Sequence, residues 1–201
     1  MMTTVILIGL AYLVGSIPFS FLVARICGVD LRQIGSGNIG AANVWRSCGF
    51  RPFLAAITLD FLKGALLPLV AIHSLGLTPV AVILIGAGAM LGHTFPLFLR
   101  FKGGKAVATS GGVLLAIFPL AVLVGVLTWT VTLRMVRISS VASLTAATMV
   151  VIVALVTLAR GSIAPAYAFF ICAAAALVFV LHRSNIRRLL AGEENRFQRL
   201  W

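Results

Sequence analysis

The feature that most constrains the fold is a run of twenty residues, from Val5 to Ala24, without a charged side chain. Twenty apolar residues in a helix cross a hydrocarbon core about 30 Å thick. The chain is 61% hydrophobic and only 10% charged, with a mean hydropathy of +1.14. A soluble domain of this size cannot bury that much apolar surface. The sequence therefore predicts an all-α integral membrane protein, with residues 1–201 forming a single membrane-embedded domain.

The first apolar run is expected to be a retained span. No Lys or Arg precedes it and no small-x-small cleavage site follows it, as a secretory signal would require. Further apolar runs long enough to be helices occupy about 53–72, 79–99, 106–133, 138–159 and 162–181.

The run at 106–133 decides the topology, because Pro119 near its middle allows either one kinked helix or two short ones. With two helices, 14 of the 16 basic residues lie on one membrane face. One helix would place most of the later arginines on the opposite face, against the tendency of Lys and Arg to stay cytoplasmic. We therefore expect seven transmembrane helices, some of them short, with the N-terminus outside and the C-terminus cytoplasmic.

The net charge of +12 follows from this arrangement. Basic residues retained on the cytoplasmic face and attracted to anionic headgroups account for it, so we expect no nucleic-acid partner. The segment 186–201 is predicted to be a basic interfacial tail with Phe197 and Trp201 as anchors. Cys27, Cys48 and Cys172 have no metal-ligand spacing, so we expect neither a metal site nor a disulfide framework.

The motif "GSGNIG" contains Gly35, Gly37 and Gly40 in the order G-x-G-x-x-G, and Asp60 follows Gly40 by twenty residues. A dinucleotide-binding fingerprint needs a buried strand before the glycines. Here the flanking segments are membrane helices and Asp60 lies inside an apolar run, so the dinucleotide interpretation is excluded.

The expected topology gathers polar residues on the cytoplasmic face. Closely spaced glycines let successive backbone N–H groups face an anion, and Arg or Lys supplies positive charge around them. Two clusters have this composition, "GSGNIG" with Arg46 and "KGGK" at 102–105. They predict a phosphate ligand, held as two phosphates or as one phosphate from two sides.

Charged and polar residues within the apolar runs have a structural alternative. Asp60 and Lys63 are spaced i and i+3, which favours a buried ion pair that braces the loops. His93 precedes Pro96 and is interpreted as a helix cap, with a functional role as the alternative. His182 and Asn185 share a helical face at the inner end of the last apolar run, so both can face one site.

Four motifs of this sequence resemble those of the bacterial acyl-phosphate-dependent glycerol-3-phosphate acyltransferases, the PlsY family. They are "GSGNIGAANVWR", "LDFLKG", "GHTFPLFLRFKGGKAVAT" and "HRSNIRRLLAGEE", and the similarity extends from about Gly15 to Glu194. The resemblance implies a seven-helix enzyme of the bacterial inner membrane whose motifs face the cytoplasm. It implies transfer of a fatty acyl group from acyl phosphate to the 1-hydroxyl of glycerol 3-phosphate, giving lysophosphatidic acid and phosphate.

The resemblance also assigns site residues. Ser36, Arg46, Lys105, His182 and Asn185 would be catalytic, whereas the substrate-binding set would comprise Gly37, Asn38, Gly40, Asn43, Gly103, Gly104 and Ser143. Two positions depart from the family pattern. Ala106 stands where the family usually has glycine, and "RISSVAS" lacks the aromatic residue common before its serines, which leaves the choice between Ser140 and Ser143 open.

The residue inventory suits direct attack on an activated donor. An acyl phosphate has a good leaving group, so positioning and charge neutralisation can supply most of the rate without a covalent intermediate. His182 has two open roles, general base or orienting hydrogen-bond partner, with a substrate phosphate oxygen taking the proton in the second. The alternative functions are a transporter of a phosphorylated metabolite and a membrane protein without turnover.

The expected partners are acyl phosphate, glycerol 3-phosphate and membrane lipid. No cofactor is expected, the protein is expected to be a monomer, and an enzyme that makes the acyl phosphate is a further candidate partner.

Overall fold

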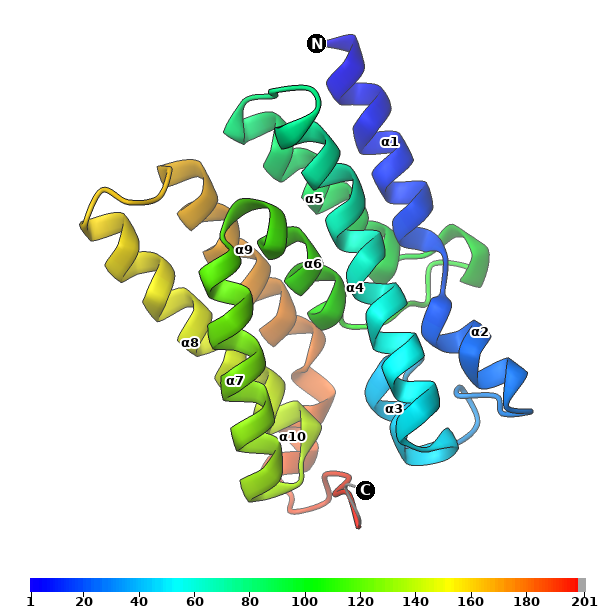
Figure 1. The fold of residues 1–201 in the computed structure, drawn as a ribbon. Coiled ribbons are helices and arrows are strands. Elements are labelled where there is room, and N and C mark those ends of the chain that lie inside the picture. The colour runs from blue at the N-terminus through cyan, green and yellow to red at the C-terminus, as the bar shows by residue number, and fades with distance from the viewer. Residues whose placement is uncertain (199–201) are drawn as a thin grey trace. The chain divides into compact units, whose positions relative to one another are not determined.

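The structure is a computed structural model that describes residues 1–198. Within that part of the chain all regular secondary structure is helical, which confirms the predicted all-α class. The helices are α1 (Met2–Ser16), α2 (Phe19–Ile26), α3 (Ala41–Cys48), α4 (Phe50–His73), α5 (Pro79–Thr94), η1 (Leu97–Leu99), α6 (Val107–Ile117), α7 (Pro119–Val136), α8 (Ser139–Ala159), α9 (Pro165–Leu181) and α10 (Arg183–Leu190) (Figure 1). They form two compact units, unit 1 (Met1–Ala116) and unit 2 (Ile117–Trp201), which we describe separately.

Five helical segments of the described chain are long and apolar enough to cross a membrane. A sixth is added if α9 and α10, which are bent by 55° relative to each other, count as one span. Helix α6 has 11 residues and is therefore about 16 Å long at about 1.5 Å per residue, roughly half of a 30 Å hydrocarbon core. The five full-length segments are Met2–Ile26, Phe50–His73, Pro79–Leu99, Pro119–Val136 and Ser139–Ala159.

The predicted division of residues 106–133 into two helices is confirmed. Helix α6 ends at Ile117 and α7 begins at Pro119. Proline favours the first position of a helix because its missing N–H would have no partner there and its φ is already helical. The same device starts α5 at Pro79 and α9 at Pro165.

The first apolar run is divided in the structure, although the sequence analysis treated it as one continuous span. Helix α1 ends at Ser16 and α2 begins at Phe19. Ile17 has extended backbone angles, φ −66° and ψ 117°, because the proline ring at position 18 disfavours the helical conformation at the residue before it. The carbonyl of Ile17 is thereby released from the helix. It accepts from the N–H of Phe19 at 3.1 Å and has a second lone pair for another donor.

Unit 1 is held together by a close approach of α1 and α5, which lie side by side in Figure 1. Gly88 and Gly92 of α5 face the backbone of α1. A Cβ at Gly88 would lie 2.9 Å from the carbonyl oxygen of Ile8, and one at Gly92 would overlap the carbonyl oxygen of Tyr12. Small residues four positions apart are the usual way for membrane helices to bring their backbones together.

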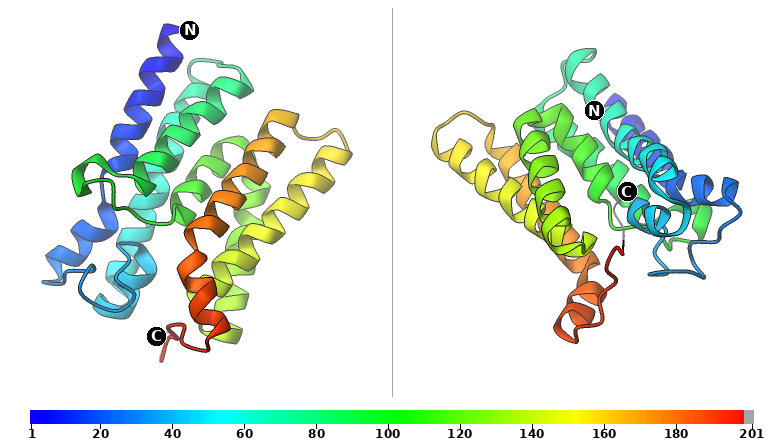
Figure 2. Two further views of the ribbon diagram at one scale, coloured as in Figure 1. Left: turned by 180° about the vertical axis from the view of Figure 1, so that it is seen from behind. Right: turned by 60° about the horizontal axis from the view of Figure 1, so that its bottom comes forward.

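Unit 2 consists of α7, α8 and α9 packed side by side, followed by α10 and an extended segment (Figure 2). The backbone N–H of Phe197 donates to the carbonyl of Arg137 at 2.8 Å, at the turn between α7 and α8. Phe197 is only 4% exposed. The prediction of Phe197 as an interfacial anchor is therefore wrong: its ring is buried in the protein. Trp201, the other predicted anchor, lies outside the described residues.

Candidate functional site

The side chain of Asn43 organises the first glycine-rich loop of unit 1. Its amide group donates to the carbonyls of Leu31, Ile34 and Asn38 at 3.1, 3.0 and 3.0 Å. Its carbonyl oxygen accepts from the backbone N–H of Ser36 at 3.2 Å. Asn43 is 2% exposed, so the loop is wrapped around a buried amide whose hydrogen-bonding groups are all used within the loop.

Local hydrogen bonds shape the same loop between residues 35 and 40. The Ser36 hydroxyl accepts from the N–H of Asn38, and the Asn38 side-chain oxygen accepts from the N–H of Gly40 at 2.9 Å. Gly35 and Gly37 have φ of 61° and 68°, in the left-handed region that residues with a Cβ avoid. The glycines at positions 35 and 37 are therefore required by the turn of the backbone.

Helix α3 follows Gly40 directly and carries Arg46 one turn after Asn43. The N-terminal N–H groups of a helix are suited to anions, because they point away from the helix along its dipole. Helix α3 is fixed on α4 by the ring of Trp45, which stacks on Phe53 with centroids 4.5 Å apart and contacts Phe50 at 5.1 Å. This aromatic cluster thus anchors the helix that follows the loop and carries the half-buried Arg46.

The second glycine-rich loop, residues 102–105, is folded back on the end of α5. The N–H of Gly103 donates to the carbonyl of Thr94 and that of Gly104 to the carbonyl of His93, both at 3.1 Å. A Cβ at Gly103 would overlap the His93 carbonyl, and one at Gly104 would overlap the His93 imidazole. Both glycines are therefore needed for the close contact, and the contact places the backbone that leads to Lys105.

Ala106 follows this loop with φ 55° and no exposed surface. Holding an L-residue in the left-handed region costs about 1–2 kcal/mol. The left-handed backbone explains why a glycine suits this position. Alanine, with its single methyl group, occupies it at this modest cost.

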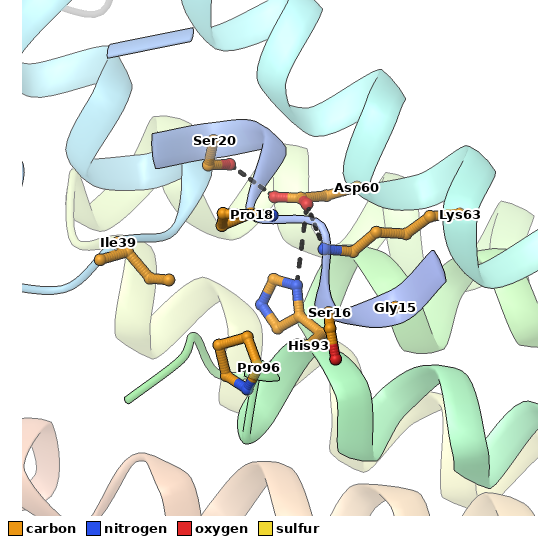
Figure 3. A pocket seen from close by; sticks show the side chains of 9 residues that line it. All are labelled: Gly15, Ser16, Pro18, Ser20, Ile39, Asp60, Lys63, His93 and Pro96. Carbon is orange, nitrogen blue, oxygen red and sulfur yellow. Dashed lines mark hydrogen bonds and ion pairs between the residues drawn. The ribbon is translucent and has the colours of Figure 1, made fainter. Parts of the chain in front are cut away.

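A third feature of unit 1 is a buried charged cluster in which Asp60 is central (Figure 3). The Lys63 ammonium lies 2.8 Å from one Asp60 carboxylate oxygen, and the Ser20 hydroxyl donates to the other at 2.5 Å. The Lys63 ammonium also donates to the released carbonyl of Ile17 at 2.8 Å. His93 Nδ1 lies 3.7 Å from Asp60. The ion pair between Asp60 and Lys63 that the i, i+3 spacing predicted is confirmed, and His93 belongs to the same cluster.

In unit 2, Glu194 binds three polar side chains, of which Ser140 lies 54 positions away in sequence. One carboxylate oxygen accepts from the Asn185 amide at 2.6 Å and from the Ser140 hydroxyl at 3.0 Å. The other accepts from Arg188 Nε at 2.7 Å. Burial raises the pKa of the Glu194 carboxyl, but the hydrogen bonds from Asn185, Arg188 and Ser140 outweigh it, so this pKa lies below its ordinary value. Glu194 is therefore ionised where it accepts the hydrogen bond from the Asn185 amide.

His182 and Ser143 have separate partners in unit 2. His182 lies at the junction of α9 and α10, 3% exposed, with Nδ1 2.8 Å from the carbonyl of Val178. A carbonyl only accepts hydrogen bonds, so the neutral ring carries its proton on Nδ1 and its lone pair on Nε2. The Ser143 hydroxyl accepts from Trp129 Nε1 at 3.2 Å.

Comparison with known proteins identifies the family. A family model described as glycerol-3-phosphate acyltransferase matches residues 5–192. The chain belongs to this family. A glycerol-3-phosphate acyltransferase from Roseiflexus sp. (strain RS-1) is 58% identical over 98% of this chain and 97% of its own, and one from Aquifex aeolicus (strain VF5) is 40% identical over 98% and 100%.

Solved structures of the glycerol-3-phosphate acyltransferase family are also similar. A crystal structure of PlsY, an integral membrane glycerol 3-phosphate acyltransferase, in its glycerol 3-phosphate form has a TM-score of 0.89 and 39% identity, covering 97% of this chain and 96% of that one. The lysophosphatidic acid form has a TM-score of 0.87 and 38% identity, covering 97% and 95%.

The predicted site residues of this family member divide between the units. Unit 1 contains both glycine loops with Arg46 and Lys105, and unit 2 contains Ser143, His182 and Asn185. The sequence analysis missed Ser20 and Glu194. The scarcity of acidic residues could have pointed to Glu194: of the four in the chain, Asp30, Asp60 and Glu194 each form an ion pair.

The hydrogen bonds of Glu194 predict a pH-dependent stability. Glu194→Gln should lower the free energy of unfolding by about 2 kcal/mol at pH 7, since hydrogen bonds to a charged group contribute about 1.5–3 kcal/mol. Because the folded pKa is below 4.5, this stabilisation is complete above pH 4.5 and is lost as the pH falls through the folded value. Unfolding in detergent at pH 7 and pH 3.5 measures the effect.

The neighbouring exposed residue supplies the control. Glu193→Gln makes the same chemical change one position away and should leave unfolding unchanged at either pH. Equal stability of Glu194→Gln and Glu193→Gln at pH 7 would contradict the role given to Glu194.

Proposed function

We propose that this protein transfers a fatty acyl group from acyl phosphate to the 1-hydroxyl of sn-glycerol 3-phosphate, giving lysophosphatidic acid and inorganic phosphate. This is the first step of phospholipid synthesis. The observation that carries the proposal is the family match over residues 5–192. It is supported by the solved relatives, described as glycerol 3-phosphate and lysophosphatidic acid forms, which are the acceptor and the product of this reaction. Both proposed substrates carry phosphate, and unit 1 has two loops of anion-binding composition.

The proposed roles in unit 1 concern phosphate. Gly37, Gly40, Gly103 and Gly104 would shape the two binding loops, because their N–H groups donate to acceptors within the protein. Phosphate oxygens would be held by the N-terminal N–H groups of α3 and by the side chains of Ser36 and Asn38. Arg46 and Lys105 would neutralise the charge that grows on the departing phosphate. Asn43, whose amide is used within the loop, would shape the binding loop.

In the proposed reaction, the acceptor hydroxyl oxygen attacks the carbonyl carbon of the acyl phosphate. The bond between that carbon and the bridging oxygen breaks, and inorganic phosphate leaves with the electron pair. The hydroxyl proton passes to a phosphate oxygen of a substrate, while His182, Asn185 and Ser143 orient the acceptor. The hydrogen bond from His182 Nδ1–H to the Val178 carbonyl fixes the ring and makes Nε2 an acceptor, which suits an orienting partner and a general base alike.

The donor assay tests the proposal directly. Purified protein in lipid should release inorganic phosphate and form lysophosphatidic acid from palmitoyl phosphate only when glycerol 3-phosphate is present. Palmitoyl-coenzyme A should not replace the acyl phosphate. Equal rates with the thioester would reassign the donor, and no transfer from either compound would reject the enzyme assignment.

The roles of the cations predict that the shape of Arg46 matters as well as its charge. Arg46→Lys should lower kcat/KM substantially, because a guanidinium holds two phosphate oxygens in a fork and an ammonium cannot. Lys105→Ala should also be severely impaired. Arg51→Lys, the same change on the exposed start of α4, is the matched control and should transfer acyl groups at the wild-type rate. Normal turnover in Arg46→Lys and Lys105→Ala would remove the basis for the phosphate sites.

The role of His182 is tested by separating hydrogen bonding from titration. His182→Ala removes both and should lose most activity. His182→Gln keeps a hydrogen-bonding group and should retain substantially more. A general base contributes a factor of about 10² to 10⁴, so if Gln is as inactive as Ala and a wild-type ionisation near neutrality disappears from the pH–rate profile, His182 is the base instead.

We further propose that the whole chain is one membrane-embedded domain of the bacterial inner membrane, acting as a monomer, with its motifs toward the cytoplasm and 186–201 as a basic tail. Seven helical segments would alternate in direction across the membrane, with the short helix α6 running outward and α7 returning. A reporter fused before Met1 should then be active only outside and one fused after Trp201 only in the cytoplasm. A cytoplasmic N-terminus would contradict the seven-span arrangement.

A further inference from the structure

The cluster of Asp60, Lys63 and His93 lies within two membrane-spanning segments, which is an expensive place for ionisable groups. The three residues are 2%, 4% and 7% exposed. Replacing a buried ion pair with apolar residues often leaves stability unchanged or raises it, so stability alone is a weak reason for such a pair. The contacts of the cluster indicate what else it does.

Its first set of contacts holds the break between α1 and α2. Lys63 donates to the carbonyl of Ile17, the group that Pro18 releases from the helix, and Asp60 accepts from Ser20 in the first turn of α2. Helix α4 is thus attached on both sides of the break. Helix α2 leads into the first glycine loop, and Ile39 of that loop lines the same small cleft as Asp60, Lys63 and His93 (Figure 3).

Its second set of contacts reaches the other glycine loop through His93. The imidazole lies 3.7 Å from Asp60 through Nδ1, and its Nε2 side lies against Gly104, where no Cβ would fit. The backbone carbonyl of the same residue accepts from the N–H of Gly104. Displacement of the His93 ring would therefore be transmitted to the loop at 102–105.

We propose that Asp60, Lys63 and His93 are positioning residues that fix the two glycine loops of unit 1 relative to each other. Each loop has local bonds that determine its own shape, through Asn43 in one and the Thr94 and His93 carbonyls in the other. The cluster contacts the segments that hold both loops: the break before α2, through Lys63 and Asp60, and Gly104, through His93. Its kinetic consequence rests on the proposed acyl transfer, whereas its structural consequence does not.

The decisive variant is Asp60→Asn/Lys63→Met, which removes both charges together. It should unfold close to the wild-type temperature, because no unpaired buried charge remains. Hydrogen–deuterium exchange should nevertheless become faster at residues 34–40 and 102–105 and stay unchanged in α8 of unit 2. For both substrates kcat/KM should fall by about a hundredfold, the loss expected for a misplacement of about 1 Å. A folded double variant with wild-type exchange and wild-type kcat/KM would overturn the proposal.

A second pair of variants decides the matter if the double variant does not fold. His93→Gln keeps a polar side chain but loses the imidazole that joins Asp60 to Gly104, so exchange at 102–105 should rise and kcat/KM should fall. His73→Gln, the same change at the exposed end of α4, should alter neither. Identical behaviour of the two glutamine variants would overturn the proposal. If the wild-type protein transfers no acyl group, the proposed function fails, and the exchange measurements still decide the positioning role.

Discussion

The structure of unit 1 depends on one constraint, that a backbone polar group inside a membrane must find a partner within the protein. Pro18 breaks the first span and leaves the Ile17 carbonyl with the N–H of Phe19 in place of a helical donor. The Lys63 ammonium supplies a second donor, and Asp60 balances its charge. These contacts hold the bend between α1 and α2 in place, and α2 leads from it into the first glycine loop.

The same solution, a buried polar side chain that organises backbone or other side chains, recurs at each part of the candidate site. Asn43 binds the carbonyls of its own loop, and Glu194 holds Asn185 and Ser140. Burying such groups is favourable only when their hydrogen bonds are made, so each arrangement is rigid once formed. Rigid donors and cations suit transfer from an activated acyl donor, because positioning and charge neutralisation can supply most of its rate.

Features that depend on local sequence were predictable. The apolar runs predict the helices, and Pro119 predicts the division between α6 and α7. The i, i+3 spacing predicts the ion pair of Asp60 and Lys63. Features that depend on contacts between distant residues were not. Nothing in the spacing of Ser140 and Glu194, 54 positions apart, indicates that they meet. An aromatic ring in a basic tail has the composition of an interfacial anchor, whereas packing buries Phe197.

If the two glycine loops of unit 1 form the site for substrate phosphate, their glycine amides should respond to its binding. Nuclear magnetic resonance of protein labelled with ¹⁵N-glycine, titrated with glycerol 3-phosphate alone, tests it at individual amides. Saturable shifts are expected at glycines of one or both loops, among Gly35, Gly37, Gly40, Gly103 and Gly104, with Gly9 and Gly161 unchanged. Saturable binding of glycerol 3-phosphate that leaves all five loop glycines unshifted would contradict this assignment of the site.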